Sequence, residues 1–145
     1  MIAIACDHAG LELKEEIIKH LNQKNIQVKD FGTYDTSSCD YPDFAYPAAK
    51  SVADGECEKG ILICGTGVGM SMCANKVKGV RCALCGDCFS AQATRQHNDA
   101  NMLAMGARVV GAGLALKILD IFLETPYEGG RHQRRIDKMS QIELK

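Results

Sequence analysis

The chain has no excess of charge of either sign, because 17 lysine and arginine residues face 18 aspartate and glutamate residues and the formal net charge is −1. Without an overall positive field, the charge does not favour DNA, RNA or an anionic membrane as a partner. The sequence also has no apolar run near the ~20 residues that a membrane-spanning helix needs. The first residues, Met1 to Asp7, have no basic segment of the kind that opens a signal peptide. We therefore expect a cytoplasmic protein with no nucleic-acid or membrane partner.

No linker, internal repeat or low-complexity segment divides the 145 residues, and this length fits one domain. Hydrophobic residues make up 46% of the chain and charged residues 24%, which are the proportions of a globular protein. A chain of this size buries enough surface to fold without disulfides or metals. We expect a single domain over residues 1–145.

Short apolar runs alternate with helical patterns along the whole chain. Strands are expected at residues 2–6, 26–31, 60–64, 80–84 and 101–105, and helices at residues 10–24, 43–54, 70–76, 88–97, 114–123 and 131–143. This alternation predicts an α/β fold with a parallel sheet, and the near-continuous apolar strands indicate that helices cover both faces. The expected architecture is a three-layer, Rossmann-like, doubly wound sheet of about five strands. Ligands of such sheets bind beyond the carboxyl ends of the strands, near the point where the strand order reverses.

Eight cysteines in a short secreted chain would suggest disulfides, but reduced thiols are the better interpretation here. Cys82, Cys85 and Cys88 have the spacing of part of an iron–sulfur site, yet Gln92 stands where the bacterial pattern needs a further cysteine. Cys82 also lies in an apolar stretch, where a thiol serves as a small core residue. Buried thiols are favoured, with a metal site as the alternative.

A glycine-rich loop follows the expected strand at residues 60–64. Cys64 ends that strand, and Gly65, Gly67 and Gly69 at alternate positions let the backbone turn tightly and expose its N–H groups. The spacing matches neither a dinucleotide fingerprint nor a Walker A loop. Met70 stands where a low-molecular-weight phosphatase loop would have arginine. The loop is either a tight strand-to-helix turn or an anion hole for a developing oxyanion.

Cys64 faces that loop and is either a core thiol or a reactive thiolate. A ring of N–H donors favours a thiolate, which can take a proton from a carbon beside a carbonyl while the N–H groups hold the resulting enediolate. Thr66 could relay or orient that charge. Asp7 and His8 end the first strand and are either a helix cap and a solvated imidazole or part of the same site.

Three arginines indicate the class of substrate. Arg131 and Arg135 are four residues apart and share a helix face, and Arg108 is a third candidate. A cation near the start of a helix opposes the helix dipole, which suggests a compensating anion such as phosphate. The alternative is a solvated basic tail. Likewise, His97 is either a surface residue or an acid–base group, with Asn98 beside it as a hydrogen-bonding residue for a sugar.

Together these motifs resemble the ribose-5-phosphate isomerase B family, which also includes galactose-6-phosphate and allose-6-phosphate isomerases. The resemblance covers nearly the whole chain. It rests on residues 6–10 (CDHAG), 40–42 (DYP), 60–69 (GILICGTGVG), 74–76 (ANK), 90–92 (SAQ), 95–99 (RQHND), 106–110 (GARVV) and 127–132 (YEGGRH).

The resemblance implies a homodimer, sometimes a dimer of dimers, whose active sites lie between subunits and need no metal or organic cofactor. Cys64 would move a proton between C1 and C2 of the sugar, and His97 of the partner subunit would open the furanose ring. Thr66 would assist the enediolate held by the loop. The remaining contacts to sugar and phosphate would come from Asp7, His8, Tyr41, Gly65, Gly67, Val68, Gly69, Asn98, Arg108, Arg131 and Arg135. The helix at residues 131–143 is expected at the dimer interface.

The expected reaction is the interconversion of ribose 5-phosphate and ribulose 5-phosphate. A hexose 6-phosphate isomerase of the same family is the alternative within this class, because one extra carbon is a modest discriminator. A non-catalytic sugar-phosphate- or nucleotide-binding module, or a thiol redox protein using Cys82, Cys85 and Cys88, would be different classes of protein. Neither accounts for the arginines, the glycine loop and His97 together.

Overall fold

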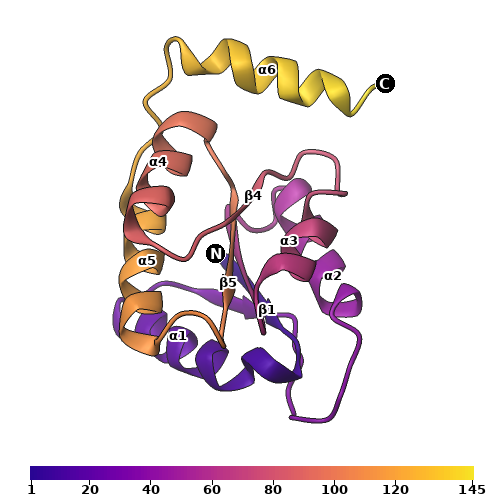
Figure 1. Cartoon of the computed structure of the whole chain (residues 1–145), viewed down its shortest axis with the longest axis vertical. Helices are drawn as coiled ribbons and strands as arrows, with labels where there is room; N and C mark the ends of the chain where they lie inside the picture. The colour runs from indigo at the N-terminus through magenta and orange to yellow at the C-terminus, as the bar shows by residue number, and fades with distance from the viewer.

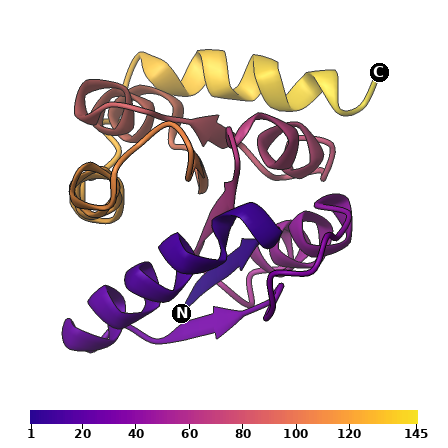
Figure 2. The same cartoon turned by 60° about the horizontal axis from the view of Figure 1, so that its bottom comes forward.

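The structure, a computed structural model, describes all residues 1–145 and is built on a five-stranded sheet. All strands are parallel, and their order across the sheet is β2-β1-β3-β5-β4. The strands are β1 (Ile2–Cys6), β2 (Val28–Asp30), β3 (Lys59–Cys64), β4 (Cys82–Leu84) and β5 (Met102–Gly106). The predicted doubly wound α/β fold is confirmed, and Figures 1 and 2 show its layers.

Helices cover both faces of the sheet. One face carries α1 (Leu11–Gln23), α4 (Cys88–Asn98) and α5 (Ala112–Glu124), and the other carries α2 (Pro42–Ala53) and α3 (Val68–Ala74). A short 3₁₀ turn, η1 (His8–Gly10), links β1 to α1. The last helix, α6 (His132–Ile142), lies outside these layers at the top of Figure 1. None of the helices combines the length and the apolar character that crossing a membrane requires.

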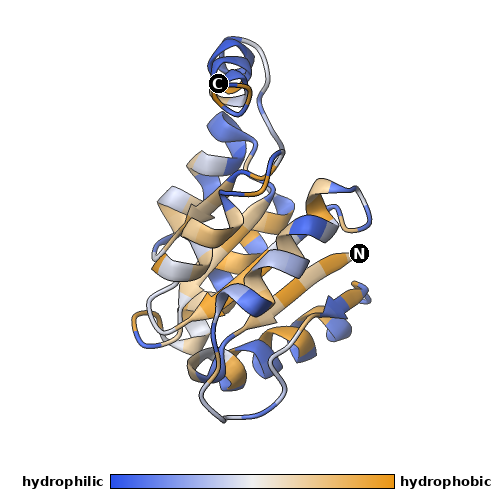
Figure 3. Cartoon of the chain, turned by 90° about the vertical axis from the view of Figure 1, so that its right-hand side faces the viewer, coloured by the Kyte–Doolittle hydropathy of each residue, from blue (hydrophilic) through white to orange (hydrophobic).

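The core has one apolar cluster on each face of the sheet. In β3, Ile61 and Ile63 belong to the cluster under α1, α4 and α5, whereas Leu62 and Cys64 belong to the cluster under α2 and α3. Successive side chains of a strand point to opposite faces, so a strand covered on both sides is apolar at every position. Figure 3 shows this as a band of hydrophobic residues through the middle of the molecule, with more hydrophilic residues on α6.

The edge strands are shorter than their sequence patterns predict. β2 and β4 have three residues each, where residues 26–31 and 80–84 were expected, because each pairs with only one neighbour. The buried Lys14 is a second departure from the apolar pattern. Its Nζ donates to Asp30 Oδ1 at 2.7 Å and to the carbonyl of Thr33, which compensates for placing an ammonium group in the core.

Candidate functional site: two clusters at opposite edges of the sheet

The strand order reverses between β1 and β3, where chain segments with the predicted site residues meet. β2 lies on one side of β1, and β3 and the later strands lie on the other. Asp7 follows β1 and its N–H donates to Ile63 O of β3 at 3.1 Å. The carboxyl ends of these two strands therefore place Asp7, His8 and the loop at residues 64–69 side by side, as expected for this fold.

Cys64 is the last residue of β3, and its side chain is almost fully buried at the base of the loop. The N–H of Gly67 donates to Cys64 Sγ at 3.1 Å. A charged sulfur accepts such a hydrogen bond more strongly than a neutral thiol does. Thr66 Oγ1 accepts from the N–H of Val68 at 3.2 Å, so its own hydroxyl proton stays free for another acceptor.

The loop is held by close backbone packing against the turn after β5. Ala107 N donates to Cys64 O at 2.8 Å, and Arg108 N donates to Gly65 O at 3.0 Å. A Cβ atom at Gly106 would lie 2.7 Å from the Thr66 backbone, so only glycine fits there. The guanidinium of Arg108 lies beside Gly65, because a Cβ atom on Gly65 would be 3.5 Å from Arg108 Nη1.

Tyr41 packs directly on the loop as well. A Cβ atom at Gly69 would lie 2.6 Å from the Tyr41 ring, and the tyrosine side chain is partly exposed. We call Asp7, His8, Tyr41, residues 64–69 and Arg108 the carboxyl-edge cluster. Every member lies at or beyond the carboxyl ends of the strands.

Asp7 and His8 have local roles that their sequence pattern only partly indicates. Asp7 Oδ1 accepts from Ala9 N at 2.9 Å and Gly10 N at 3.2 Å, so it caps η1. His8 Nδ1 accepts from the N–H of Cys39 at 3.3 Å. In the neutral imidazole the proton then lies on Nε2, which leaves that nitrogen as a donor.

The thiols of Cys82, Cys85 and Cys88 are divided between the two core clusters. Cys82 packs against the α2/α3 cluster, whereas Cys85 and Cys88 belong to or pack against the α1/α4/α5 cluster. Burial raises the pKa of Cys82 to about 12 and that of Cys85 to about 11. Because Cys82 lies on one face of the sheet and Cys85 and Cys88 lie on the other, the three thiols are not gathered into one site.

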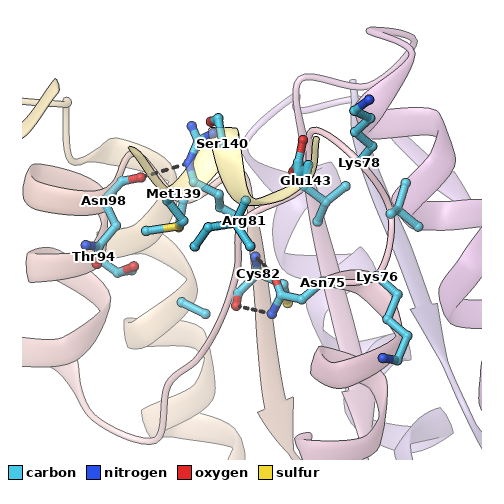
Figure 4. A pocket seen from close by; sticks show the side chains of 15 residues that line it. Asn75, Lys76, Lys78, Arg81, Cys82, Thr94, Asn98, Met139, Ser140 and Glu143 are labelled. Atoms are coloured by element: carbon cyan, nitrogen blue, oxygen red, sulfur yellow. Dashed lines mark hydrogen bonds between the residues drawn. The ribbon is translucent and has the colours of Figure 1, made fainter. Parts of the chain in front are cut away.

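His97 and Asn98 lie at the opposite edge of the sheet, where the amino ends of the strands are and which we call the amino edge. Because α4 starts after the carboxyl end of β4 and runs back antiparallel to the strands, its last turn lies at the amino edge. Arg81, directly before β4, anchors this end. Its Nε donates to Asn98 O at 2.9 Å (Figure 4), and its Nη2 donates to Asp99 O at 2.9 Å. Arg95 Nη1 donates to Asp99 Oδ1 at 2.8 Å and adds a second anchor.

Arg131 and Arg135 join His97 and Asn98 around a hollow of about 290 Å³. Arg131 precedes α6 and Arg135 lies one turn into it. The imidazoles of His97 and His132 stack with their centroids 4.6 Å apart. We call His97, Asn98, Arg131, His132 and Arg135 the amino-edge cluster; two guanidiniums beside imidazoles suit a phosphate.

The two clusters do not meet within one chain. β3 separates the two edges, and six residues of strand span about 20 Å. Cys64 and His97 of the same chain therefore cannot act on one small molecule. Likewise Arg108 lies at the carboxyl edge, apart from Arg131 and Arg135 at the amino edge.

Helix α6 leaves a second, larger hollow of about 950 Å³ between itself, the end of α4 and the segment before β4 (Figure 4). His132 and Ile136 are the only buried residues of this helix. The apolar residues Met139 and Ile142 line the hollow and are 43% and 66% exposed. This hollow lies away from Cys64, under an incompletely covered helix.

Known proteins match nearly the whole chain, both in sequence and in fold. The family model for ribose/galactose isomerases matches residues 2–139. The chain belongs to the ribose/galactose isomerase family. Ribose-5-phosphate isomerase B of Escherichia coli K12 is 51% identical over 142 residues, covering 98% of this chain and 95% of the relative.

Two solved structures of the family superpose on the full chain. Ribose-5-phosphate isomerase B of Clostridium thermocellum has a TM-score of 0.97 at 50% identity, covering 99% of this chain and 97% of that one. The Mycoplasma genitalium enzyme, solved with bound ribulose-5-phosphate, has a TM-score of 0.95 at 49% identity and covers 99% and 96% of the two chains. Both clusters lie inside the matched region.

Three residues at the clusters were not singled out by sequence reasoning. Cys39 reaches His8 through its backbone N–H, and no side-chain pattern announces a backbone contact. Arg81 anchors Asn98 from 17 positions away along the chain. His132 lies next to Arg131 in the YEGGRH motif, and this adjacency was the available signal.

Proposed function

We propose that the chain interconverts ribose 5-phosphate and ribulose 5-phosphate at a site completed by two copies of the chain. Family membership and the names of the relatives support the reaction, and these names favour the pentose over the hexose 6-phosphate alternative. The single observation that carries the shared site is the separation of Cys64 from His97 and the two α6 arginines at opposite edges of one sheet.

In this proposal Cys64 is the base. As a thiolate it removes the proton from C2 of the open-chain aldose, which leaves an enediolate, and it returns a proton to C1 to give the ketose. The free hydroxyl proton of Thr66 and the N–H groups of residues 65–69 stabilise the negative oxygen of the intermediate. Two observations support this assignment. Cys64 is buried at the base of the loop, and its sulfur accepts a hydrogen bond from the N–H of Gly67.

The amino-edge cluster of the partner subunit supplies the remaining groups. His97 donates a proton to the ring oxygen to open the furanose, and Asn98 hydrogen-bonds the sugar. Arg131 and Arg135 bind the phosphate from one subunit, and Arg108 and His8 bind it from the other. Asp7 and Tyr41 contact the sugar.

The second copy also covers α6 in this proposal. The exposed Met139 and Ile142 and the hollow under the helix leave apolar surface that a homodimer interface would bury. A dimer with two-fold symmetry presents each amino-edge cluster to the other subunit's carboxyl-edge cluster. It thereby forms two equivalent sites.

Mixing two inactive variants tests both the roles and the sharing. General acid–base groups contribute about 10²–10⁴-fold, so Cys64→Ala and His97→Asn should each lower kcat for ribose 5-phosphate by that order. A mixed dimer has one site with both groups intact. Unfolding and refolding the two variants together at equal concentrations should therefore restore about 25% of wild-type activity, because about half of the dimers are mixed and each has one working site.

The matched control pairs two variants from the same cluster. Cys64→Ala mixed with Thr66→Ala leaves no site intact and should give no gain over the unmixed proteins. Recovery in this control pair, or none in the Cys64/His97 pair while light scattering shows a dimer, would refute the shared site. Full activity of Cys64→Ala alone would refute the base, and comparing kcat/KM for pentose and hexose phosphates ranks the substrates.

A further inference from the structure

Three potential metal ligands converge at the amino-edge cluster. The donor atoms of His97, Glu128 and His132 all lie within 4.8 Å of one another. They come from the last turn of α4, the loop before α6 and the first residue of α6. The loop is tied to α4, since Glu128 N donates to Gln96 O at 3.2 Å, so the three residues are held together by the backbone.

His132 has a ring nitrogen without a partner. Its side chain is 8% exposed, and Nε2 is the only buried side-chain nitrogen or oxygen in the chain with no hydrogen bond. That nitrogen faces Glu128 Oε2 at 3.4 Å, which is too long for a good hydrogen bond. A buried polar atom without a hydrogen-bond partner destabilises the folded chain, so a ligand bound to this nitrogen would remove that destabilisation.

The spacing fits a zinc ion. Tetrahedral zinc with bonds of about 2.0–2.1 Å holds its ligand atoms ~3.3 Å apart, close to the 3.4 Å between Glu128 and His132. His97 must leave its stack on His132 to point at the same ion. Its exposed side chain allows this rotation without disturbing the core.

We propose that His97, Glu128 and His132 form a binding site for a divalent transition-metal ion, represented by Zn²⁺. Two imidazoles and a carboxylate are the ligand set that favours such an ion over Mg²⁺ or Ca²⁺. Arg131 and Arg135 line the adjoining hollow and oppose a cation, and the Glu128 carboxylate offsets one of these charges. The arginines make an anion a suitable fourth ligand.

An ion at this site removes a functional group from the amino-edge cluster. The His97 nitrogen that binds the ion cannot hold the proton needed for ring opening. The site is therefore inhibitory, and this consequence, unlike metal binding itself, rests on the proposed function. A phosphate held by Arg131 and Arg135 beside the ion would be trapped rather than released.

Cobalt binding tests the site independently of activity. Co²⁺ is added to the full-length protein, and its visible absorption and the heat of binding are recorded for wild type, Glu128→Gln and His132→Gln. We expect one ion per chain in wild type, with a tetrahedral cobalt spectrum and no sulfur-to-cobalt charge-transfer band. Loss of a group that merely hydrogen-bonds a metal ligand lowers metal affinity by about 10–100-fold. Each of these variants loses a ligand itself, so each should bind cobalt at least about tenfold more weakly than wild type does.

His20→Gln is the matched control. His20 Nε2 lies 2.8 Å from Asp120 Oδ1, a histidine–carboxylate pair without a second imidazole. This variant should bind cobalt as wild type does. Glu128→Gln guards against misfolding, because its side chain is half exposed whereas His132 is buried.

The consequence for catalysis is measured separately. Zn²⁺ should inhibit the isomerisation of ribose 5-phosphate by wild type at the concentration at which it binds, and Glu128→Gln should resist it at least about tenfold better. Unchanged cobalt binding in both ligand variants, or a sulfur-to-cobalt band, would overturn the site. Binding as expected in a protein without isomerase activity would support the site and refute the proposed function instead.

Discussion

The carboxyl-edge and amino-edge clusters are built in different ways. The first is made largely of backbone: the loop at residues 64–69 is wedged between Tyr41 and the turn at Gly106, and its groups are continuous with the core. The second is made of side chains on helix ends, which Arg81 and Arg95 hold through carbonyls and one carboxylate. One chain thus combines a cluster fixed by packing with a cluster fixed by polar anchors.

This difference predicts different responses to mutation. Overfilling a packed site typically costs 1–3 kcal/mol and displaces the backbone. Removing a hydrogen bond to a charged group costs about 1.5–3 kcal/mol at most, and less where solvent reaches it. Changes at the carboxyl edge should therefore lower stability and activity together, whereas changes at the amino edge should act mainly on activity.

The largest effect is expected from Gly106→Ala. The added Cβ would lie 2.7 Å from the carbonyl carbon and oxygen of Thr66, which are backbone atoms and cannot rotate away. We expect a loss of about 2–3 kcal/mol in the free energy of unfolding. We also expect kcat/KM to fall by about 100-fold, because displacement of a reacting group by 1 Å costs that order. Urea unfolding and steady-state kinetics measure the two effects.

Gly111→Ala is the control for this change. A Cβ at Gly111 meets nothing within 4 Å, so the same substitution five residues later should leave both quantities close to wild type. Equal effects of the two substitutions would show that close packing at Gly106 does not determine the loop geometry.

A smaller effect is expected from Arg81→Gln at the amino edge. Losing the bonds from its guanidinium to Asn98 O and Asp99 O frees the last turn of α4, which carries His97. We expect kcat/KM to fall about tenfold, equivalent to about 1.4 kcal/mol, with little change in the melting temperature. Arg81→Lys should recover part of the loss, and Lys19→Gln, which removes an exposed cation without an ion pair, should cause none. A drop in stability as large as that of Gly106→Ala would abolish the contrast between the clusters.

The smallest effect at neutral pH concerns the thiols of Cys6, which is buried, and Cys82, which is partly buried. Burial raises the pKa of Cys6 and of Cys82 to about 12, from 9.0 for an ordinary thiol. In the unfolded chain these thiols ionise near pH 9, whereas in the folded chain they stay protonated. Their contribution to stability is therefore complete below pH 9 and is lost as the pH rises toward 12. The melting temperature should therefore be lower at pH 10.5 than at pH 8, and Cys82→Ala should reduce this difference. An equal difference in the variant and in wild type would contradict the assignment.

Local patterns were sufficient to predict most of the fold and many of the candidate residues. The apolar run at residues 60–64 and the glycines that follow it predict a buried strand and a tight turn, because strand burial and turn chemistry depend on neighbours in sequence. Asp7 at a helical cap was one of the two interpretations open, and the structure shows this contact. The resemblance to a family supplied the roles of Cys64 and His97, which remain proposals.

Other features depend on contacts between distant residues. A buried Lys14 contradicts its own polarity and is explained only by the carboxylate and carbonyl of residues 30 and 33. The unpaired nitrogen of His132 likewise depends on its burial beside His97 and Glu128. No spacing in the sequence encodes either contact.

Local patterns in the chain are enough to place the strands and helices and to find a loop that can expose its N–H groups, and the side-chain types make Cys64, His97 and the arginines candidates for a base, an acid and phosphate ligands. Only the folded chain shows that β1 lies between β2 and β3 and that β5 lies between β3 and β4. The physical reason is that hydrophobic periodicity orients each element toward a core but does not choose its neighbour. Pairing between distant strands makes that choice, and here it put β1 beside β3, so that Asp7, His8 and the loop at residues 64–69 lie side by side.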